Sequence, residues 1–366
     1  MGETTLEINL SALKNNVQVL RSKIDKDTML LAVVKAFAYG SDALKIAQHL
    51  ETLGIDYFAV AYISEGVKLR EAGIKTPILV LHPQPINFPH VLEHNLEPSL
   101  YSFNTLKSFV KVAESKHHKN YPVHIKFNTG LNRLGFKESQ LAEVVNIINN
   151  NKSISVTSIF SHLAASEDSN ELAFTRSQIR QFKSIAEHFE ALYGRSVLKH
   201  LCNTSGVVNF PEEKFDMVRC GIGIYGYDNM ENHKSAFVPV VALKTIISQI
   251  HTIEKGQSVG YNRAFIADQT KKIATLPIGH ADGIGRQYGN GVGAVRVHGH
   301  SVPIVGNVCM DMIMIDVTGV DCEEGDEVVL FDKHTTAEEF ASNGNTISYE
   351  LLTGISQRVK RKFITE

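Results

Sequence analysis

The sequence predicts an α/β protein, in which an N-terminal (β/α)8 barrel of the TIM type is followed by a C-terminal antiparallel β domain. From Met29 to about Tyr225, eight short apolar runs alternate with longer amphipathic stretches, as strands and helices do in such a barrel. After Tyr227 the helical periodicity fades, and short β-branched runs separated by glycines follow, which is typical of antiparallel sheets. The 366 residues also exceed the ~250–300 at which a single core stops growing.

The barrel strands are expected at the apolar runs, with helices between them, for example at Ser64 to Gly73 and at Leu172 to Tyr193. An open doubly wound sheet would show the same alternation and stays an alternative. The runs are LLAVV (30–34), YFAVAY (57–62), PILVLH (77–82), PSLYS (98–102), VHIKF (123–127), SVTSIFSH (155–162), VLKHLC (197–202) and DMVRCGI (216–222).

This pattern divides the chain into three expected segments. Residues 11–232 are expected to form the barrel, and residues 233–366 the β domain. In residues 1–10, Thr5 to Leu10 alternate like an edge strand, which we expect to pair with the C-terminal domain.

Composition narrows the class of protein. With 37 basic and 39 acidic residues the formal net charge is -2, so neither nucleic acid nor an anionic membrane is an expected partner. The four cysteines show no C-x-x-C spacing, and neither a metal site nor a disulfide framework is indicated. No signal peptide or ~20-residue apolar span is present in the sequence. We expect a soluble, cytoplasmic protein.

Lys35 directly follows the first buried run. Burying an ammonium group costs several kcal/mol unless something compensates the charge. One interpretation is that the side chain extends to solvent. The other is that Lys35 bonds covalently to an aldehyde cofactor, with a phosphate held by the turn at Tyr39-Gly40-Ser41.

Further polar residues stand at the carboxyl ends of expected strands, where barrel enzymes build their sites. The last strand runs from Arg219 into Gly221-Ile222-Gly223, whose backbone amides suit a phosphate. A buried ion pair for Arg219 and a hydrogen-bonded core position for His162 are the structural alternatives. The polar residues at these strand ends are Lys126, His162, Asn203 and Arg219.

VVKAFAYG (33–40) resembles the cofactor-lysine segment of the alanine racemases, a family of fold-type III enzymes dependent on pyridoxal 5'-phosphate (PLP). Other segments resemble the family in the same order along residues 31 to 358. They are HIKFNTGLNRLGF (124–136), IFSHLA (159–164), HLCNTSG (200–206), RCGIGIYG (219–226), SVGYNRAF (258–265), GHADGIGR (279–286), GNVCMD (306–311) and SYE (348–350).

The resemblance implies that Lys35 holds PLP and that Arg219 faces the pyridine nitrogen. A guanidinium keeps its proton near neutral pH, so the ring would be a restrained electron sink and transamination would be limited. The resemblance implies that His162 lies near the cofactor ring and that Asn203 contributes to cofactor binding at the rim of the barrel. The phosphate contacts implied are Tyr39, Thr204, Gly221, Ile222 and Tyr349.

Tyr261 is implied as the second acid-base group, opposite Lys35, although without the resemblance it reads as a turn aromatic. A free phenol is a weak base at neutral pH, so help is expected from Arg219 through His162.

Substrate contacts are implied for Arg133, Met310 and Asp311. Lys126 is implied to be carboxylated, so that it pairs with Arg133. Two positions depart from the family pattern: Asn128 replaces the usual Asp, which puts the modification of Lys126 in doubt, and His280 replaces a tyrosine at the substrate entrance.

The resemblance implies an alanine racemase that interconverts L- and D-alanine by a two-base mechanism and supplies D-alanine for peptidoglycan. It also implies an obligate homodimer whose active sites are shared between subunits. The alternatives are a racemase of serine, lysine or another amino acid, a fold-type III decarboxylase in which Cys309 would act, and a non-catalytic PLP carrier.

Overall fold

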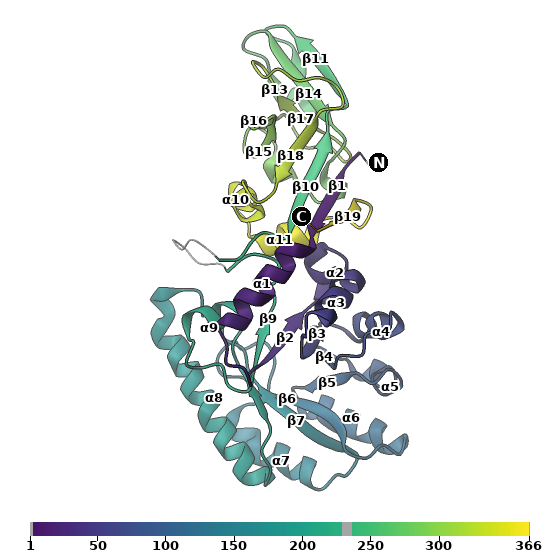
Figure 1. The fold of residues 1–366 in the computed structure, drawn as a ribbon, viewed down its shortest axis with the longest axis vertical. Helices are drawn as coiled ribbons and strands as arrows, with labels where there is room; N and C mark the ends of the chain where they lie inside the picture. Colours follow the sequence, from purple (N-terminus) through teal and green to yellow (C-terminus); the bar gives the residue numbers. More distant parts are fainter. Residues whose placement is uncertain (1–2, 229–235, 366) are drawn as a thin grey trace.

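The computed structural model describes residues 3–228 and 236–365, and a barrel and a β domain lie end to end in it (Figure 1). Eight parallel strands close the barrel, and a nine-stranded sheet forms the second domain. The expected fold class is confirmed, and the closed barrel rules out the open doubly wound sheet. The expected domain boundary near residue 232 lies outside the described residues.

Each of the eight apolar runs overlaps one barrel strand, and the strands pair in chain order until β9 closes on β2. Most of their residues are buried, because side chains fill the barrel on one face and helices cover the other. The strands are β2 (Met29–Val33), β3 (Tyr57–Val60), β4 (Ile78–Val80), β5 (Glu97–Leu100), β6 (Tyr121–Lys126), β7 (Ile154–Phe160), β8 (Leu198–His200) and β9 (Met217–Cys220).

Helices connect the barrel strands. The longest, α8 (Leu172–Tyr193), has the expected bounds, buries residues at three- and four-residue intervals, and ends at Gly194 in the left-handed conformation, a common helix stop. The others are α1 (Leu10–Ser22), α2 (Lys35–Gly40), α3 (Ala43–Thr52), α4 (Ile63–Glu71), α5 (Phe88–Glu93), α6 (Phe103–Ser115), α7 (Leu141–Asn149) and α9 (Thr204–Asn209), with the 3-10 turns η1 (Pro85–Asn87), η2 (Glu138–Gln140) and η3 (Ser169–Glu171).

The β domain is built on one sheet with the strand order β11-β14-β17-β16-β15-β18-β10-β1-β19, and a separate hairpin joins β12 to β13. The nine strands are β1 (Thr5–Asn9), β10 (Val241–Ile246), β11 (Gln249–Ile253), β14 (Lys271–Leu276), β15 (Ala294–Val297), β16 (His300–Val305), β17 (Ile313–Asp316), β18 (Glu327–Phe331) and β19 (Lys360–Ile364). The remaining elements are β12 (Ser258–Val259), β13 (Phe265–Ile266), α10 (Ala337–Asn343), α11 (Ser348–Gly354), η4 (Tyr261–Arg263), η5 (His280–Asp282) and η6 (Arg286–Tyr288).

The two ends of the chain meet in this sheet. β1 pairs antiparallel with β10 and parallel with β19. The basic C-terminal segment, which shows no strand signal in the sequence, therefore forms an edge strand. Its Arg361 donates to the carbonyl oxygens of Gly40 (2.7 Å) and Ser41 (3.1 Å), so the β domain contacts the loop that follows Lys35.

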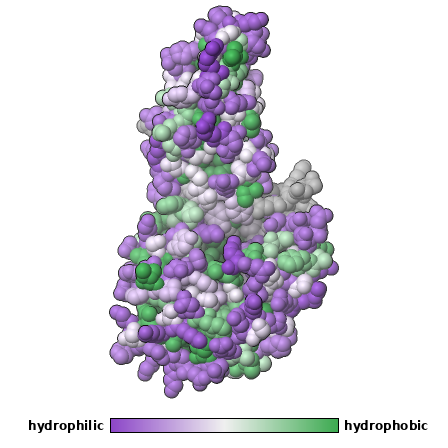
Figure 2. Space-filling view, turned by 180° about the vertical axis from the view of Figure 1, so that it is seen from behind, coloured by the Kyte–Doolittle hydropathy of each residue, from purple (hydrophilic) through white to green (hydrophobic). Residues whose placement is uncertain are grey.

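The surface is polar over most of the face shown in Figure 2, and its apolar patches there are small and scattered. Within residues 3–228 and 236–365, no helix combines the length and the apolar character needed to cross a bilayer.

Candidate active site

A cavity of about 620 Å³ opens at the carboxyl ends of the barrel strands. This is the end at which (β/α)8 enzymes carry their catalytic groups. Eleven of the residues singled out from the sequence line it. They are Lys35, Tyr39, Lys126, Arg133, His162, Asn203, Thr204, Arg219, Gly221, Ile222 and Tyr349.

The chain makes a left-handed turn directly after Lys35. Four consecutive residues, from Ala36 to Tyr39, have φ between 52° and 56°, which costs about 1–2 kcal/mol for each residue with a Cβ. The Glu65 carboxylate accepts from the Ala36 amide at 2.7 Å, and Arg361 holds the carbonyl of Gly40 at the other end. Strain of this kind persists where surrounding contacts impose it, often at functional sites.

Lys35 is an amine with reduced basicity. Burial lowers its pKa, the Arg133 cation lowers it further, and the Glu65 carboxylate partly opposes both. A larger share of the neutral, nucleophilic amine is therefore present at a given pH than for an exposed lysine.

Arg219 is buried, with 4% of its surface exposed, and no carboxylate pairs with it among the described residues. Its guanidinium donates to the carbonyls of Ser161, His200 and Leu201, and to Nδ1 of His162 (3.0 Å) and of His200 (2.9 Å). Burial lowers the pKa of Arg219 to about 10, so it stays charged near neutral pH. The structural alternative of a buried ion pair is thus not found among the described residues.

Both imidazoles beside Arg219 are neutral near pH 7. Burial, and then the Arg219 cation, holds the pKa of His162 and of His200 well below the usual range. Since a guanidinium only donates, each histidine accepts at Nδ1 and carries its single ring hydrogen on Nε2.

The loop after β9 has the character of a phosphate site. The amides of Gly221 and Ile222 are buried and have no acceptor among the residues that the structure describes, which is rare without a ligand. A Cβ at Gly221 would overlap the hydroxyl of Tyr39, and one at Gly223 would overlap the Thr204 side chain. Backbone amides and hydroxyl groups thus surround a space that no further side chain can enter. Such a space suits a dianion such as phosphate.

Lys126 and Arg133 line the same cavity. Burial lowers the pKa of Lys126 to about 8, with the Arg219, Arg133 and Lys35 cations adding to the effect. Asn128 takes no part in this charge balance. Its Oδ1 accepts from the amides of Gly130 and Asn132, so it stabilises its own turn, a role that an asparagine fills as well as an aspartate.

Asn203 fills a structural role at the cavity rim. Its Oδ1 accepts from the Gly206 amide and from the Ser166 hydroxyl, both at 2.8 Å, and so caps α9.

The remaining predicted residues lie apart, around a second cavity of about 540 Å³ in the β domain that shares no lining residue with the first. Tyr261 is 75% exposed and Met310 59% exposed. Asp311 pairs with Arg358 at 2.8 Å. His280, at the start of η5, is exposed. One chain therefore does not bring Tyr261, Met310 and Asp311 to the Lys35 cavity.

Several residues that line the Lys35 cavity were not predicted from the sequence. Tyr62 and His82 end the runs YFAVAY and PILVLH, so the strand-end rule that picked Lys126 could have found them. Phe160 lies two residues before His162 on an inward-facing strand position. Its ring stacks on His200 with centroids 4.7 Å apart, and the Arg219 guanidinium lies 5.3 Å from its centroid.

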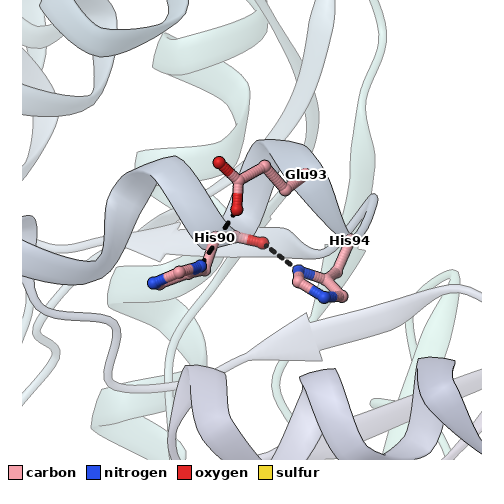
Figure 3. A group of neighbouring side chains, drawn as sticks. All are labelled: His90, Glu93 and His94. Atoms are coloured by element: carbon pink, nitrogen blue, oxygen red, sulfur yellow. Dashed lines mark hydrogen bonds and ion pairs between the residues drawn. The ribbon is translucent and has the colours of Figure 1, made fainter.

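His90, Glu93 and His94 form a separate group at the C-terminal end of α5 (Figure 3). Their ligand atoms lie within 4.8 Å of one another, close enough to hold a metal ion. His90 Nδ1 lies 3.0 Å from the Glu93 carboxylate, and His94 Nδ1 lies 3.1 Å from the His90 carbonyl. His90 and Glu93 are more than half exposed, and these two contacts make the group a hydrogen-bonded surface cluster.

Known proteins resemble this chain over its whole length. The family profile of the alanine racemase N-terminal domain matches residues 8–229, and that of the alanine racemase C-terminal domain matches residues 240–363. The chain belongs to the alanine racemase family.

Named alanine racemases are similar at the level of sequence. The alanine racemase of Thermodesulfovibrio yellowstonii is 36% identical over 368 residues, covering 98% of this chain and 97% of that protein. That of Methanococcus maripaludis is 35% identical over 368 residues, with 98% of each chain covered.

Solved structures of alanine racemases share the fold. The Clostridium difficile 630 enzyme has a TM-score of 0.94 and 31% identity, covering 100% of this chain and 97% of that chain. The Bartonella henselae enzyme, described with covalently bound pyridoxal phosphate, has a TM-score of 0.90 and 31% identity, with both chains fully covered.

Proposed function

We propose that the protein is a PLP-dependent alanine racemase that interconverts L-alanine and D-alanine. The observation that carries the proposal is the barrel-mouth cavity, where the Lys35 amine, the charged Arg219 and the unpaired amides of Gly221 and Ile222 meet. PLP held there supplies an electron sink that acidifies the hydrogen on the α-carbon of a bound amino acid.

Each residue of this cavity has a defined task. Lys35 binds the cofactor covalently, and when substrate displaces it, its amine holds or moves a proton at one face of the α-carbon. The amides of Gly221 and Ile222 and the hydroxyls of Tyr39, Thr204 and Tyr349 bind the phosphate.

Arg219 restrains the cofactor ring electronically. As a permanent donor it leaves the pyridine nitrogen without a proton, so less negative charge moves into the ring. Arg219 would therefore favour return of the proton to the α-carbon over the diversion to transamination. A decarboxylase relies on a carboxylate that protonates this nitrogen, so the placement of Arg219 disfavours the decarboxylase in which Cys309 acts.

Arg133 suits the substrate carboxylate, because its fork can donate two parallel hydrogen bonds. We further propose that Lys126 is carboxylated. Its neutral amine, made accessible by the lowered pKa, forms an N–C bond with CO2 and releases a proton. The resulting carbamate offsets the repulsion between Lys126 and Arg133.

The second base is Tyr261 of the partner subunit. Two bases are needed because one side chain cannot reach both faces of a clamped α-carbon. The separation of the two cavities within one chain supports this arrangement, as do Tyr261, Met310 and Met312, which expose large apolar side chains around the second cavity. A two-fold homodimer would place each second cavity over the partner's barrel mouth and complete both sites at once.

Hybrid dimers test the sharing of sites. Lys35→Ala and Tyr261→Phe chains with different tags are co-expressed, and doubly tagged dimers are isolated. One site of each hybrid then carries both substitutions and the other carries neither, so we expect about half of the wild-type activity, whereas each homodimeric variant is inactive. Doubly tagged Lys35→Ala dimers are the control. Hybrids as inactive as that control would show that each site lies within one chain.

We also propose that the enzyme acts in the cytoplasm and supplies D-alanine for peptidoglycan. The cysteines form no disulfide in the described residues, in keeping with a reducing compartment. Expression of the gene should restore growth of a bacterium that requires D-alanine, and the Lys35→Ala variant should not. A lack of rescue by an active, well-expressed protein would count against this role.

A further inference from the structure

A row of polar side chains runs through the barrel interior from Arg219 to Glu97, on five neighbouring strands from β9 to β5. Arg219 Nη1 lies 2.9 Å from His200 Nδ1, and His200 Nε2 lies 2.8 Å from Ser158 Oγ. Ser158 Oγ lies 2.6 Å from His124 Nδ1, and His124 Nε2 lies 2.8 Å from Glu97 Oε2. The two histidines and the serine are fully buried, and the Glu97 side chain is 13% exposed.

Only one arrangement of hydrogens satisfies the whole row. Arg219 must donate, so His200 accepts at Nδ1 and donates from Nε2 to Ser158. The Ser158 hydroxyl then has one hydrogen left to give, and it donates to Nδ1 of His124. His124 donates from Nε2 to Glu97, which as a carboxylate accepts. Any other arrangement leaves the Ser158 hydrogen without an acceptor or sets two hydrogens against each other.

The row therefore has a direction. Every hydrogen points away from the cation of Arg219 and towards the anion of Glu97, and Tyr57 donates to the same carboxylate at 3.2 Å. The interior of a (β/α)8 barrel is usually packed with branched apolar side chains. Polar groups there are tolerated only when fully hydrogen-bonded, and this row meets that condition.

We propose that Glu97 is a positioning residue for the racemase reaction, acting on Arg219 through His124, Ser158 and His200. This inference rests on the proposed function of the Arg219 cavity. Arg219 and Glu97 fix the direction of the row from its two ends. Because Glu97 can only accept, it holds the His124 hydrogen on Nε2 and leaves Nδ1 to accept from the Ser158 hydroxyl. If His124 instead turned an N–H towards Ser158, the Ser158 hydroxyl would compete with Arg219 for the single lone pair of the His200 ring and loosen the guanidinium at the cofactor site.

Glu97→Gln is the decisive variant, since its carboxamide is nearly isosteric but can donate as well as accept. His124 can then carry its hydrogen on either ring nitrogen. Ser158→Ala interrupts the row in the middle, and Ser158→Thr restores a hydroxyl. Ser99→Ala is the matched control. Ser99 is a fully buried serine on β5, in register with His124, and its hydroxyl has no partner among the described residues.

The first readout is the histidine tautomer, measured by 15N NMR on the protein freed of PLP. In the wild type and in Ser99→Ala we expect His200 and His124 with the hydrogen on Nε2 alone. In Glu97→Gln we expect a mixture of tautomers at His124, while Arg219 keeps most of the His200 hydrogen on Nε2. In Ser158→Ala and Ser158→Thr, where Arg219 and Glu97 still hold their own histidines, we expect the wild-type tautomers.

The second readout is turnover. The kcat for alanine should fall about ten-fold to a hundred-fold in Glu97→Gln and Ser158→Ala. The KM should change little, because Arg219 contacts the cofactor rather than the substrate. Ser99→Ala should stay within about two-fold, below the loss of one hydrogen bond.

An unchanged His124 tautomer in Glu97→Gln would overturn the proposal, whatever happens to kcat. So would an altered tautomer with kcat no lower than in Ser99→Ala. If Glu97→Gln fails to fold, kcat decides: a Ser158→Ala value no lower than that of Ser99→Ala, or no recovery in Ser158→Thr, would overturn the proposal. A wild type that does not racemise alanine would refute the proposed function instead, and the tautomer pattern would still be measurable.

Discussion

Nη2 of Arg219 donates to Nδ1 of His162 over 3.0 Å at the mouth of the barrel. The contact joins a cation to an imidazole whose pKa is held far below its usual range, so His162 stays neutral with its hydrogen on Nε2. In the proposed dimer that N–H is the group through which the Arg219 charge acts on Tyr261 of the partner subunit.

Arg219→Glu tests the electronic role of the guanidinium. A carboxylate would bring a proton to the pyridine nitrogen and deepen the electron sink. We expect racemisation to fall about a hundred-fold, while pyruvate formed by transamination rises. Chiral chromatography and a coupled pyruvate assay measure the two products. Arg219→Lys keeps the charge and is the control, and a Glu variant that forms no more pyruvate than it does would contradict this role.

The lowered pKa of Lys126 predicts that the free energy of unfolding of the protein depends on pH. This pKa is about 8 in the folded protein, whereas an unfolded lysine titrates near ~10.4. Below pH 8 both states are protonated, and the folded state bears the full cost of the buried charge. Between the two pKa values only the unfolded chain holds the proton, so stability rises with pH, by about 3 kcal/mol in total.

Urea denaturation at pH 7 and pH 10, in CO2-free buffer without PLP, measures this effect. Lys126→Met removes the titrating group, so the wild type should gain stability relative to this variant as the pH rises. Equal changes in the two proteins would show that Lys126 is not buried as a charged group.

Gly221→Ala tests the phosphate site. Its Cβ would overlap the Tyr39 hydroxyl and fill the space that the amides leave open. We expect the Kd for PLP to rise about ten-fold or more, the equivalent of one charge-assisted hydrogen bond. Gly354→Ala is the matched control, because nothing lies within 4 Å of a Cβ there. Fluorescence titration with PLP gives both constants, and equal Kd values in the two variants would argue against a phosphate at this loop.

Arg361→Ala tests the support of the left-handed turn. Arg361 donates to five carbonyl oxygens, including those of Gly40 and Ser41. Its loss should lower the free energy of unfolding by about 3 kcal/mol and weaken PLP binding as the turn relaxes. Lys362→Ala removes only an exposed ion pair with Glu7, which is worth about 1 kcal/mol or less. Similar losses in the two variants would show that the carbonyl contacts do not support the turn.

The barrel was predictable because parallel strands buried on both faces leave uninterrupted apolar runs, and polar residues at their carboxyl ends stand out. Lys35, Lys126, His162 and Arg219 were found in this way. The turn at Tyr39 and the amides of Gly221 and Ile222 also stood out as a phosphate site. Motif resemblance added Arg133, Tyr261 and the phosphate contacts Thr204 and Tyr349, which no periodicity marks.

Other features depend on contacts between distant segments. The left-handed turn at Ala36 to Tyr39 opposes the local preference of its residues and exists because Glu65 and Arg361 hold it. The row of polar side chains from Arg219 to Glu97 is recognised only when the register of five strands is known, and the sequence does not give that register. The separation of Tyr261 from Lys35 follows from no pattern in the residues themselves, and only the family resemblance implied a site shared between subunits.

The most direct test is to incubate the PLP-loaded protein with L-alanine in D2O and to resolve the products by chiral chromatography and mass spectrometry. The account predicts equal amounts of L- and D-alanine, deuterium at the α-carbon and no release of CO2, with no reaction in Lys35→Ala. Release of CO2, or alanine that stays in the L form without deuterium, would contradict it.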